Sequence, residues 1–414
     1  MSKPEARAIA GGYRYTWAAE QLQATVTRII DDHRGGTTAE INFKVISGPN
    51  AGHLHQCRMN MMSTPTKKSL VSALRSRSIP EVEWDAIVET LCVDALRRHR
   101  LGEPIVEIGT RPGREGPAYR LDPMLPEGQP TIIFGEGGSF KSYLALLIAH
   151  LVQSGKSELG LIPKQGNVLY VDYETSADEL NERALALWRG LGEDAPLGIS
   201  YRFSSQSVDT DIESLQNAVN ERDVDLLIVD SLGPAAGSDP NAAENIIRLF
   251  ANLRALRVTC LLVDHVAKNS DHPTPFGSVY KTNLARSVWE CRRVHNAGAI
   301  RIGLYHRKHN MGPLHNALGF EIEFSNDLNG RPENVSIAKF EVRDDEELAA
   351  GLPLTKRIKN VLGGGAVSEA ELTDRVRAPL VDVQKRLSYL KKKVRPEVIE
   401  LSGHVWGLAT DIPF

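Results

Sequence analysis

The sequence predicts an α/β protein whose central domain is built on a mostly parallel sheet. Between residues 130 and 343, short apolar runs alternate with helix-like stretches, which is the pattern of strands joined by crossover helices. A glycine-rich loop, residues 135–142, stands between the first such run and the first helix. We expect an N-terminal α+β domain (1–103), a Gly/Pro-rich linker (104–129), the central domain (130–343), an acidic linker (344–352) and a C-terminal helical domain with a hairpin (353–414).

The composition is that of an ordinary globular protein. The chain has 414 residues, of which 42% are hydrophobic and 24% charged, with a net charge of −3, so any nucleic-acid footprint must be local. No apolar run reaches membrane-spanning length and the N-terminus has no signal-peptide pattern, so we expect no membrane partner. The four cysteines are scattered without a C-x-x-C pair, which favours a reducing cytoplasm: Cys57, Cys92, Cys260 and Cys291.

The N-terminal domain is predicted to contain strands at Leu22–Ile30 and Ala39–Ile46 and a helix at Trp84–Arg98. Its biochemical role is not indicated by these patterns. Three potential metal ligands, His53, His55 and Cys57, alternate along a further strand and so share one face. We prefer to interpret them as an ordinary strand face, because no fourth metal ligand is evident. Four basic residues in a helix-leaning stretch fit either nucleic-acid contact or simple solvation: Lys67, Lys68, Arg75 and Arg77.

The glycine-rich loop has the pattern of a phosphate-binding loop. The strand-like run 131–134 precedes it and a helix-like stretch, 143–153, follows it. In this context backbone N–H groups surround phosphate oxygens and the helix adds its positive end. Lys141 is expected to reach the β- and γ-phosphates and Ser142 to hold Mg²⁺, so ATP and Mg²⁺ are the predicted cofactors. The loop reads Gly135-Glu136-Gly137-Gly138-Ser139-Phe140-Lys141-Ser142.

Phe140 stands where the motif has its last glycine. A residue with a Cβ atom is disfavoured in the left-handed backbone region. We therefore expect Phe140 to avoid that region, with Gly137 and Gly138 taking up the turn.

Three later strands are predicted to end in polar side chains beside this loop. The apolar run 225–230 ends in Asp230, the arrangement that holds the water shell of Mg²⁺. The run 167–174 ends in Glu174, which is placed to activate the attacking water. The run 258–265 ends in His265, which by itself is compatible with an ordinary core histidine. Ligands in parallel sheets bind at the carboxyl ends of strands, so we expect these side chains to meet.

This order of motifs resembles that of the RecA-fold ATPases of the AAA family, and within them the plasmid RepA-type hexameric replicative helicases. The resemblance covers roughly residues 125–343. It implies a RecA-like core in which Glu174 is the catalytic glutamate and His265 the γ-phosphate sensor. It also implies a ring of subunits, a homo-hexamer, with single-stranded DNA in its central channel.

The same resemblance implies a finger residue, a positively charged side chain that reaches into the nucleotide site of the neighbouring subunit. Lys308-His309-Asn310-Met311-Gly312-Pro313 is similar to the Lys-x-Arg-x-Gly-Pro stretch of DnaB-type helicases, with Asn310 where that pattern has arginine. Arg286 closes a Gly277-Ser278…Asn283-x-x-Arg run that resembles the RepA-type finger region. The candidate fingers are therefore Arg286, Arg307 and Lys308.

Residues 353–414 are predicted to fold as three helices and a hairpin, which resembles a winged helix-turn-helix. This segment has 11 Lys and Arg against 7 Asp and Glu, a local excess of four positive charges. Its third helix, opened by Pro379, is expected to carry Leu380, Val383, Leu387 and Leu390 on one apolar face. The opposite face would contact duplex DNA, or alternatively a protein partner: Lys385, Ser388, Tyr389 and Lys392.

Two functions remain open from the sequence, with a third less favoured. The first is an ATP-driven motor on nucleic acid, a hexameric DNA helicase or translocase acting in replication. The alternative is a DNA-bound ATPase switch, such as a replication initiator, partition or regulatory protein without unwinding activity. A P-loop kinase is the third, and the chain has no obvious lid or acceptor-binding signature for it.

Overall fold

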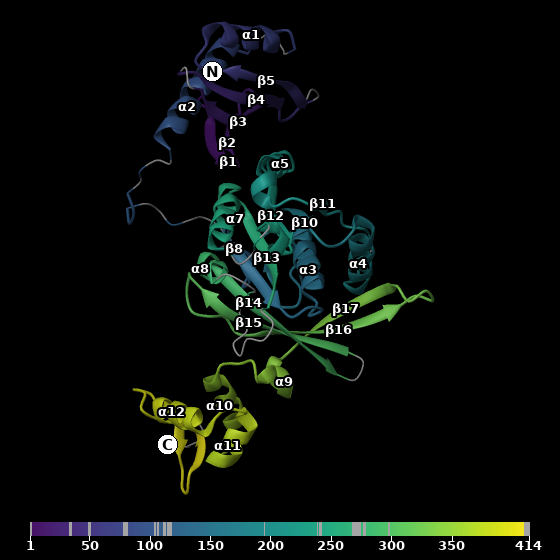
Figure 1. Ribbon diagram of the computed structural model, residues 1–414, viewed down its shortest axis with the longest axis vertical. Helices are drawn as coiled ribbons and strands as arrows, with labels where there is room; N and C mark the ends of the chain where they lie inside the picture. Colours follow the sequence, from purple (N-terminus) through teal and green to yellow (C-terminus); the bar gives the residue numbers. More distant parts are fainter. Residues whose placement is uncertain are drawn as a thin grey trace. The chain divides into compact units, whose positions relative to one another are not determined.

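The computed structural model describes residues 2–32, 35–48, 51–77, 82–102, 105, 107–110, 113, 118–193, 195–237, 239, 242–266, 275, 279–296 and 299–409 (Figure 1). Two compact units are formed. The first consists of Met1–Gly116, Val208–Val224 and Ala251–Val258, and the second of Pro117–Ser207, Asp225–Phe250 and Thr259–Phe414. Most of the predicted Gly/Pro-rich stretch before residue 118, together with Gly277 and Ser278, lies outside the described residues. None of the described helices has the length and apolar character needed to cross a membrane.

The N-terminal residues form a five-stranded antiparallel sheet with two helices, which confirms both predicted strands. The order is β1-β2-β3-β4-β5, and Trp17, Phe43 and Trp84 are fully buried in its core. Two strands, β1 and β2, were not predicted, because both are short. The elements are β1 (Glu5–Ile9), β2 (Gly12–Trp17), β3 (Leu22–Asp31), β4 (Thr37–Val45), β5 (Gly52–Asn60), α1 (Thr64–Arg75) and α2 (Trp84–Leu101), with α5 (Val208–Glu221) in the same unit.

His53, His55 and Cys57 all lie on β5, as expected, but the strand does not gather them into a metal site. His53 instead places its Nδ1 3.2 Å from the Asn42 side-chain oxygen. The described part of the chain contains one group of three potential metal ligands, and it lies elsewhere. The ordinary strand face is the interpretation that fits.

The second unit is organised on a nine-stranded sheet of order β11-β10-β12-β13-β8-β14-β15-β16-β17. Pairing is parallel between β10 and β11 and from β12 through β13 and β8 to β14, then antiparallel from β14 to β17. The sheet is thus parallel where the predicted site lies and antiparallel at one edge. Its strands are β8 (Pro130–Gly135), β10 (Asn167–Asp172), β11 (Ser200–Phe203), β12 (Val224–Asp230), β13 (Thr259–His265), β14 (Ser287–Asn296), β15 (Ala299–His309), β16 (Leu318–Asn326) and β17 (Pro332–Phe340).

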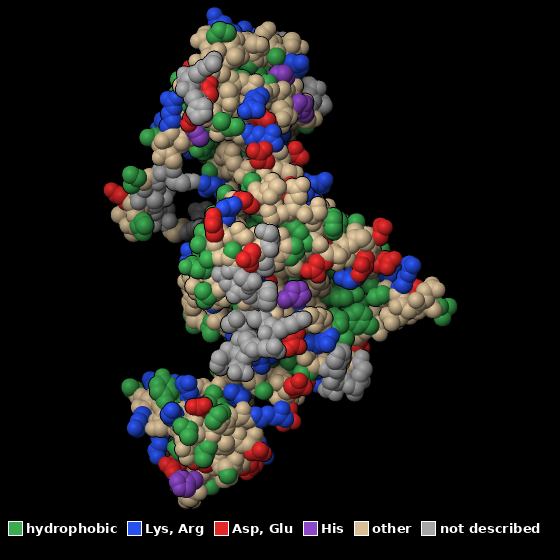
Figure 2. All heavy atoms as spheres, viewed as in Figure 1, with side chains coloured by type: hydrophobic (Ala, Val, Ile, Leu, Met, Phe, Trp, Pro, Cys, Tyr) green, Lys and Arg blue, Asp and Glu red, His purple; other side chains and the backbone are tan. Residues whose placement is uncertain are grey.

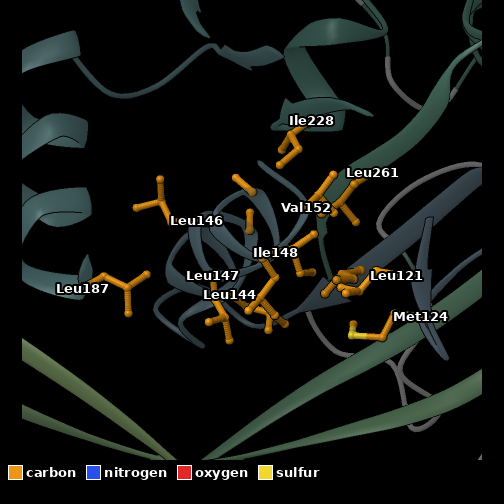
Figure 3. Packing of buried hydrophobic residues seen from close by; sticks show 14 of the residues in the cluster. Leu121, Met124, Leu144, Leu146, Leu147, Ile148, Val152, Leu187, Ile228 and Leu261 are labelled. Carbon is orange, nitrogen blue, oxygen red and sulfur yellow. The ribbon is translucent and has the colours of Figure 1, made fainter. Parts of the chain in front are cut away.

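The helix that follows the glycine-rich loop, α3 (Lys141–Ser154), forms the middle of the hydrophobic core. Every residue from Leu144 to Val152 is buried, because the sheet covers one side of the helix and α4 (Ala177–Gly190) another. Figure 3 shows Leu144, Leu147 and Ile148 of α3 pointing into a cluster that Leu187 and Ile228 join from other elements. The remaining helices here are α6 (Leu232–Ala235), α7 (Ala243–Ala255) and α8 (Tyr280–Leu284).

Both predicted linkers contain residues that are buried. In the first, Leu121, Met124 and Leu125 join the core beside α3, because residues 119–126 form part of a small sheet of order β7-β6-β9. In the second, Leu348 and Leu352 turn inward and Asp345 is also buried, while Asp344, Glu346 and Glu347 are exposed. The elements are β6 (Tyr119–Asp122), β7 (Leu125–Pro126), β9 (Ile162–Pro163), η1 (Val342–Asp344) and α9 (Glu346–Ala349).

The C-terminal segment has the predicted order of three helices and a hairpin, with a third short strand added to the sheet. Val383, Leu387 and Leu390 face its core as expected, whereas Leu380, on the same face, is 45% exposed. Leu380 is the first residue of its helix, before the helix meets the core. The elements are α10 (Leu354–Gly363), β18 (Val367–Ser368), α11 (Glu369–Val376), α12 (Leu380–Lys391), β19 (Val398–Glu400) and β20 (Val405–Leu408).

Candidate active site

The glycine-rich loop joins β8 to α3, and two of its glycines are required by geometry. A Cβ atom on Gly135 would lie 2.4 Å from the carbonyl oxygen of Cys291 on the neighbouring strand β14. Gly138 has φ +69°, in the left-handed region that glycine adopts at little cost. The loop can therefore leave the sheet in close contact with β14 and then turn its backbone into the first turn of α3.

Phe140 adopts φ 65° and ψ 21°, so the expectation that it avoids the left-handed region was wrong. The strain of such a backbone, of order 1–2 kcal/mol for a residue with a Cβ atom, is offset by packing of the ring. The ring of Phe140 lies 5.5 Å from that of Phe324 and 5.9 Å from that of Tyr143, centroid to centroid. The Arg293 guanidinium lies 5.8 Å from its centroid.

Lys141 is buried within the loop and binds its backbone. The Nζ atom donates to the carbonyl oxygens of Gly135 at 3.0 Å and Glu136 at 2.6 Å, and to the Ser139 hydroxyl at 3.2 Å. Burial lowers the pKa of Lys141. This places the ammonium at the centre of the loop. A bound phosphate oxygen would there replace one of these carbonyl oxygens as the hydrogen-bond acceptor of Nζ.

The carboxylate of Asp230 lies at the end of β12, with the hydroxyl of Ser142 hydrogen-bonded to it. Tyr170 donates to its Oδ2 at 2.7 Å. Burial raises the pKa of Asp230, against the hydrogen bonds from Tyr170 and Ser142, which favour the ionised form. A hydroxyl next to a carboxylate is an oxygen donor set suited to Mg²⁺.

Glu174 follows β10 by two residues, in a bend rather than on the strand. Asp172 fixes this bend, since its Oδ1 accepts from the backbone N–H groups of Glu174 at 2.8 Å and Thr175 at 3.1 Å. His265 Nε2 lies 3.9 Å from Glu174 Oε1, and Ser231 donates to the same oxygen at 2.6 Å. His265 and then Ser231 lower the pKa of Glu174 to about 2, so the carboxylate is ionised at neutral pH.

These residues line one cavity of about 560 Å³ at the carboxyl ends of the parallel strands. The volume lies within the range of small-molecule sites. Eight of the predicted residues line it: Gly138, Ser139, Phe140, Lys141, Ser142, Glu174, Asp230 and His265. A nucleoside triphosphate with a divalent cation therefore fits both the donor set and the space.

Three contributors to this site were not identified from the sequence. Ser231 holds the Glu174 carboxylate, and Tyr170 holds Asp230. Arg293 of β14 donates to the Gly138 carbonyl oxygen at 2.5 Å and lines the cavity. Ser231 directly follows Asp230, which is a usable signal, whereas no motif marks Tyr170 or Arg293.

The three candidate fingers lie away from this cavity. Ser287 pairs with Thr131 at the start of β8 and Cys291 pairs with Gly135 at its end, so the two ends are roughly 13 Å apart. Arg286, next to Ser287, is exposed at the end of the sheet remote from the phosphate loop. Lys308 caps α8 by donating to the carbonyl oxygens of Thr282, Asn283 and Ala285 at 2.7–2.8 Å.

Arg307 is also engaged within the fold. Its Nε donates to Glu290 at 2.6 Å and its guanidinium lies 4.9 Å from the Tyr305 ring centroid. In the described part of the chain Arg286 has no ion-pair partner, and it is exposed whereas Arg307 and Lys308 are half-buried. The geometry therefore favours Arg286 over Arg307 and Lys308 as a residue available to another molecule.

Lys385 and Tyr389 of α12 and Lys392, the residue after it, are exposed, and Ser388 is half-buried. Figure 2 shows Lys and Arg side chains interspersed with hydrophobic ones over this C-terminal segment. The neighbouring lysines are paired: Lys391 with Glu400 at 2.8 Å, and Lys393 with Glu397. The four predicted residues thus share a polar face, opposite Val383, Leu387 and Leu390.

Residues 106–271 match a family model described as an AAA domain. This range contains the phosphate loop, Glu174, Asp230 and His265. The site and this match together indicate a nucleotide-binding ATPase domain in this part of the chain.

Among solved structures, the chain is similar to a KaiC-like protein from Pyrococcus horikoshii OT3, with 16% identity and a TM-score of 0.38 over 53% of this chain and 93% of that one. It is also similar to the flagellar accessory protein FlaH from Methanocaldococcus jannaschii, with 14% identity and a TM-score of 0.35 over 51% and 90%. Comparison with the curated proteins gives no match.

Proposed function

We propose that this chain is an ATP-hydrolysing motor on DNA, a RepA-like hexameric helicase or translocase acting in replication. Within each site, Lys141 and the loop backbone would hold the phosphates, and Ser142 and Asp230 the cation. Mg²⁺ in this position neutralises charge that develops on the transferred phosphoryl group. Glu174, ionised and held by Ser231, would accept a proton from the attacking water.

The observation that carries the assembly part of this proposal is the position of Arg286. An exposed cation at the remote end of β14 is too far from its own phosphate loop to serve it. It suits a neighbouring subunit's site if subunits pack head to tail, as in a closed ring. His265, beside Glu174, would report the presence of the γ-phosphate to the residues that follow β13.

DNA binding is supported by the exposed basic face of α12 and by the local excess of positive charge in residues 353–414. The alternative, a DNA-bound ATPase switch, requires the same hydrolytic site and the same C-terminal face. It differs in lacking strand displacement.

Three measurements on the purified chain test the proposal. We expect an increase in mass to a hexamer on addition of ATP and Mg²⁺, an ATPase rate stimulated by single-stranded DNA, and displacement of a strand from a forked duplex. Stimulation without displacement would favour the switch. Full ATPase activity in a strict monomer would remove the ring and the finger together.

A further inference from the structure

Three imidazoles converge where β15 ends and the chain returns towards β16. The potential ligand atoms of His306, His309 and His315 all lie within 4.8 Å of one another. The ring centroids are 4.9–5.2 Å apart. This group lies at the end of the sheet remote from the phosphate loop, since His309 pairs with Ser287 and Ser287 with Thr131. The ATPase site makes no use of it.

We propose that His309 and His315 are the primary ligands of a divalent transition cation of the zinc class, with His306 and Tyr119 completing the site. Imidazole is the preferred side-chain ligand for Zn²⁺, Co²⁺ and Ni²⁺. The Nε2 atoms of His309 and His315 both face the hydroxyl of Tyr119, at 3.3 and 3.0 Å. Both imidazole nitrogens thus lie within hydrogen-bond distance of the phenol oxygen, and the three groups come from β15, the following loop and β6.

The second nitrogen of His309 has the partner that a metal-binding histidine usually has. Its Nδ1 lies 3.1 Å from the carbonyl oxygen of Pro313. A carbonyl oxygen only accepts, so Nδ1 carries the hydrogen and the lone pair is on Nε2. A backbone carbonyl that fixes the tautomer in this way orients the ligand and raises its basicity.

His306 positions the loop that brings His315 to His309. Its Nδ1 accepts the backbone N–H of His315 at 3.1 Å, and its Nε2 lies 3.1 Å from the Ser287 hydroxyl. Its ring stacks on that of Trp289 at 4.2 Å and an interplanar angle of 5°. Both nitrogens are therefore in use, and His306 would bind the cation only by exchanging one of these hydrogen bonds.

Binding requires a modest contraction of the group. Nitrogens bonded to tetrahedral zinc at about 2.0–2.1 Å are roughly 3.3 Å apart. The 4.8 Å spread must therefore close by roughly 1.5 Å. The loop can supply this movement, since residues 310–314 are all exposed and the core constrains only His306 among the three histidines.

The test is zinc binding by the untagged full-length chain, measured by equilibrium dialysis with elemental analysis. We expect one equivalent of Zn²⁺, and with Co²⁺ the visible absorption of a four-coordinate site. His309→Ala and His315→Ala should each weaken Zn²⁺ binding at least about tenfold. The matched control is the double variant His53→Ala, His55→Ala, which removes two histidines from β5 and should keep the full equivalent.

The proposal is overturned if the wild-type chain binds no zinc, or if His309→Ala and His315→Ala bind it as tightly as wild type. Loss in the β5 control alone would transfer the site to that strand and equally overturn the proposal. Circular dichroism of each variant verifies folding. Should either alanine variant unfold, His309→Gln and His315→Gln, which preserve side-chain bulk and polarity, are measured in the same way.

Discussion

The Ser231 hydroxyl donates a hydrogen bond to the Glu174 carboxylate at 2.6 Å, across 57 residues of sequence. Ser231 directly follows Asp230, the carboxylate placed to hold the cation. Ser231 therefore links Glu174, the candidate base after β10, to Asp230, the candidate cation ligand at the end of β12.

Glu174→Gln is expected to retain ATP binding and to lower the rate of hydrolysis by about 10²-fold or more, because it removes the base but leaves the phosphate loop. Binding of a fluorescent ATP analogue and phosphate release measure the two effects. Ser231→Ala should give a smaller loss, since it frees the carboxylate without removing it. A Glu174→Gln variant that hydrolyses ATP at the wild-type rate would exclude Glu174 from catalysis.

Phe140→Gly and Phe140→Ala form a matched pair that measures the energetic cost of the left-handed backbone at this position. Both remove the ring that packs on Tyr143 and Phe324. Only alanine keeps the Cβ atom at φ 65°. We expect the glycine variant to be more stable than the alanine variant by about 1 kcal/mol, measured by denaturant unfolding. Equal stability would mean that the loop relaxes to another conformation.

The sequence predicted the residues of the cavity because each one stands at a position with its own local signal. Lys141 follows a glycine-rich turn, Asp230 ends an apolar strand and His265 ends another, and parallel strands bring such ends together. Arg293 could not be found in this way, because it reaches the loop from the middle of a strand whose neighbour is set by tertiary pairing. The left-handed backbone of Phe140 was mispredicted because it also depends on a tertiary contact. The strain of this backbone is offset by packing of the ring on Phe324, which is remote in sequence.

Arg286→Ala is expected to abolish most ATP hydrolysis in the assembled protein while leaving the stability of the chain within about 0.5 kcal/mol of wild type, because the side chain is exposed. Lys308→Ala should instead lower stability, since three carbonyl oxygens of the α8 end lose their donor. Thermal unfolding and ATPase assays on both variants separate the two roles.

Mixing experiments test whether Arg286 acts between subunits. Combining Glu174→Gln subunits with Arg286→Ala subunits should restore part of the activity, because some interfaces then carry both intact residues. A mixture without any recovery would argue that Arg286 does not act in trans.

His150 predicts a pH-dependent contribution to stability that is separate from catalysis. This α3 residue is 1% exposed, lies 4.8 Å from the Trp188 ring centroid and has its Nε2 3.0 Å from Glu193. Burial lowers the pKa of His150 below its usual value near 6.5. The unfolded chain therefore binds the proton first as pH falls, and stability is lost below about pH 6.5.

His150→Phe keeps a ring against Trp188 and removes the ionisable group. Relative to wild type, this variant should gain stability as pH falls from 7 to 5, by at most about 1.4 kcal/mol per pH unit. The comparison uses unfolding midpoints at each pH. Parallel pH profiles for the two proteins would show that His150 does not titrate differently in the folded chain.

The C-terminal face predicts salt-dependent binding of duplex DNA. Lys385 and Lys392 are exposed on or next to α12, whereas Lys391 and Lys393 are paired with Glu400 and Glu397. An unpaired lysine that contacts a phosphate releases a counterion, and each contact adds about 0.9 to the slope of log affinity against log salt. The double variant Lys385→Ala, Lys392→Ala should therefore lower the affinity and reduce the slope by roughly 1.8.

The matched control is Lys391→Ala with Lys393→Ala, which removes the same formal charge from residues already neutralised by glutamates. It should change the slope less, and neither double variant should alter ATP hydrolysis measured without DNA. Fluorescence anisotropy of a labelled duplex over a salt series gives the slopes. If both pairs reduce the slope equally, the effect is one of net charge and not of a specific face. If neither does, residues 353–414 are better assigned to contact with a protein partner.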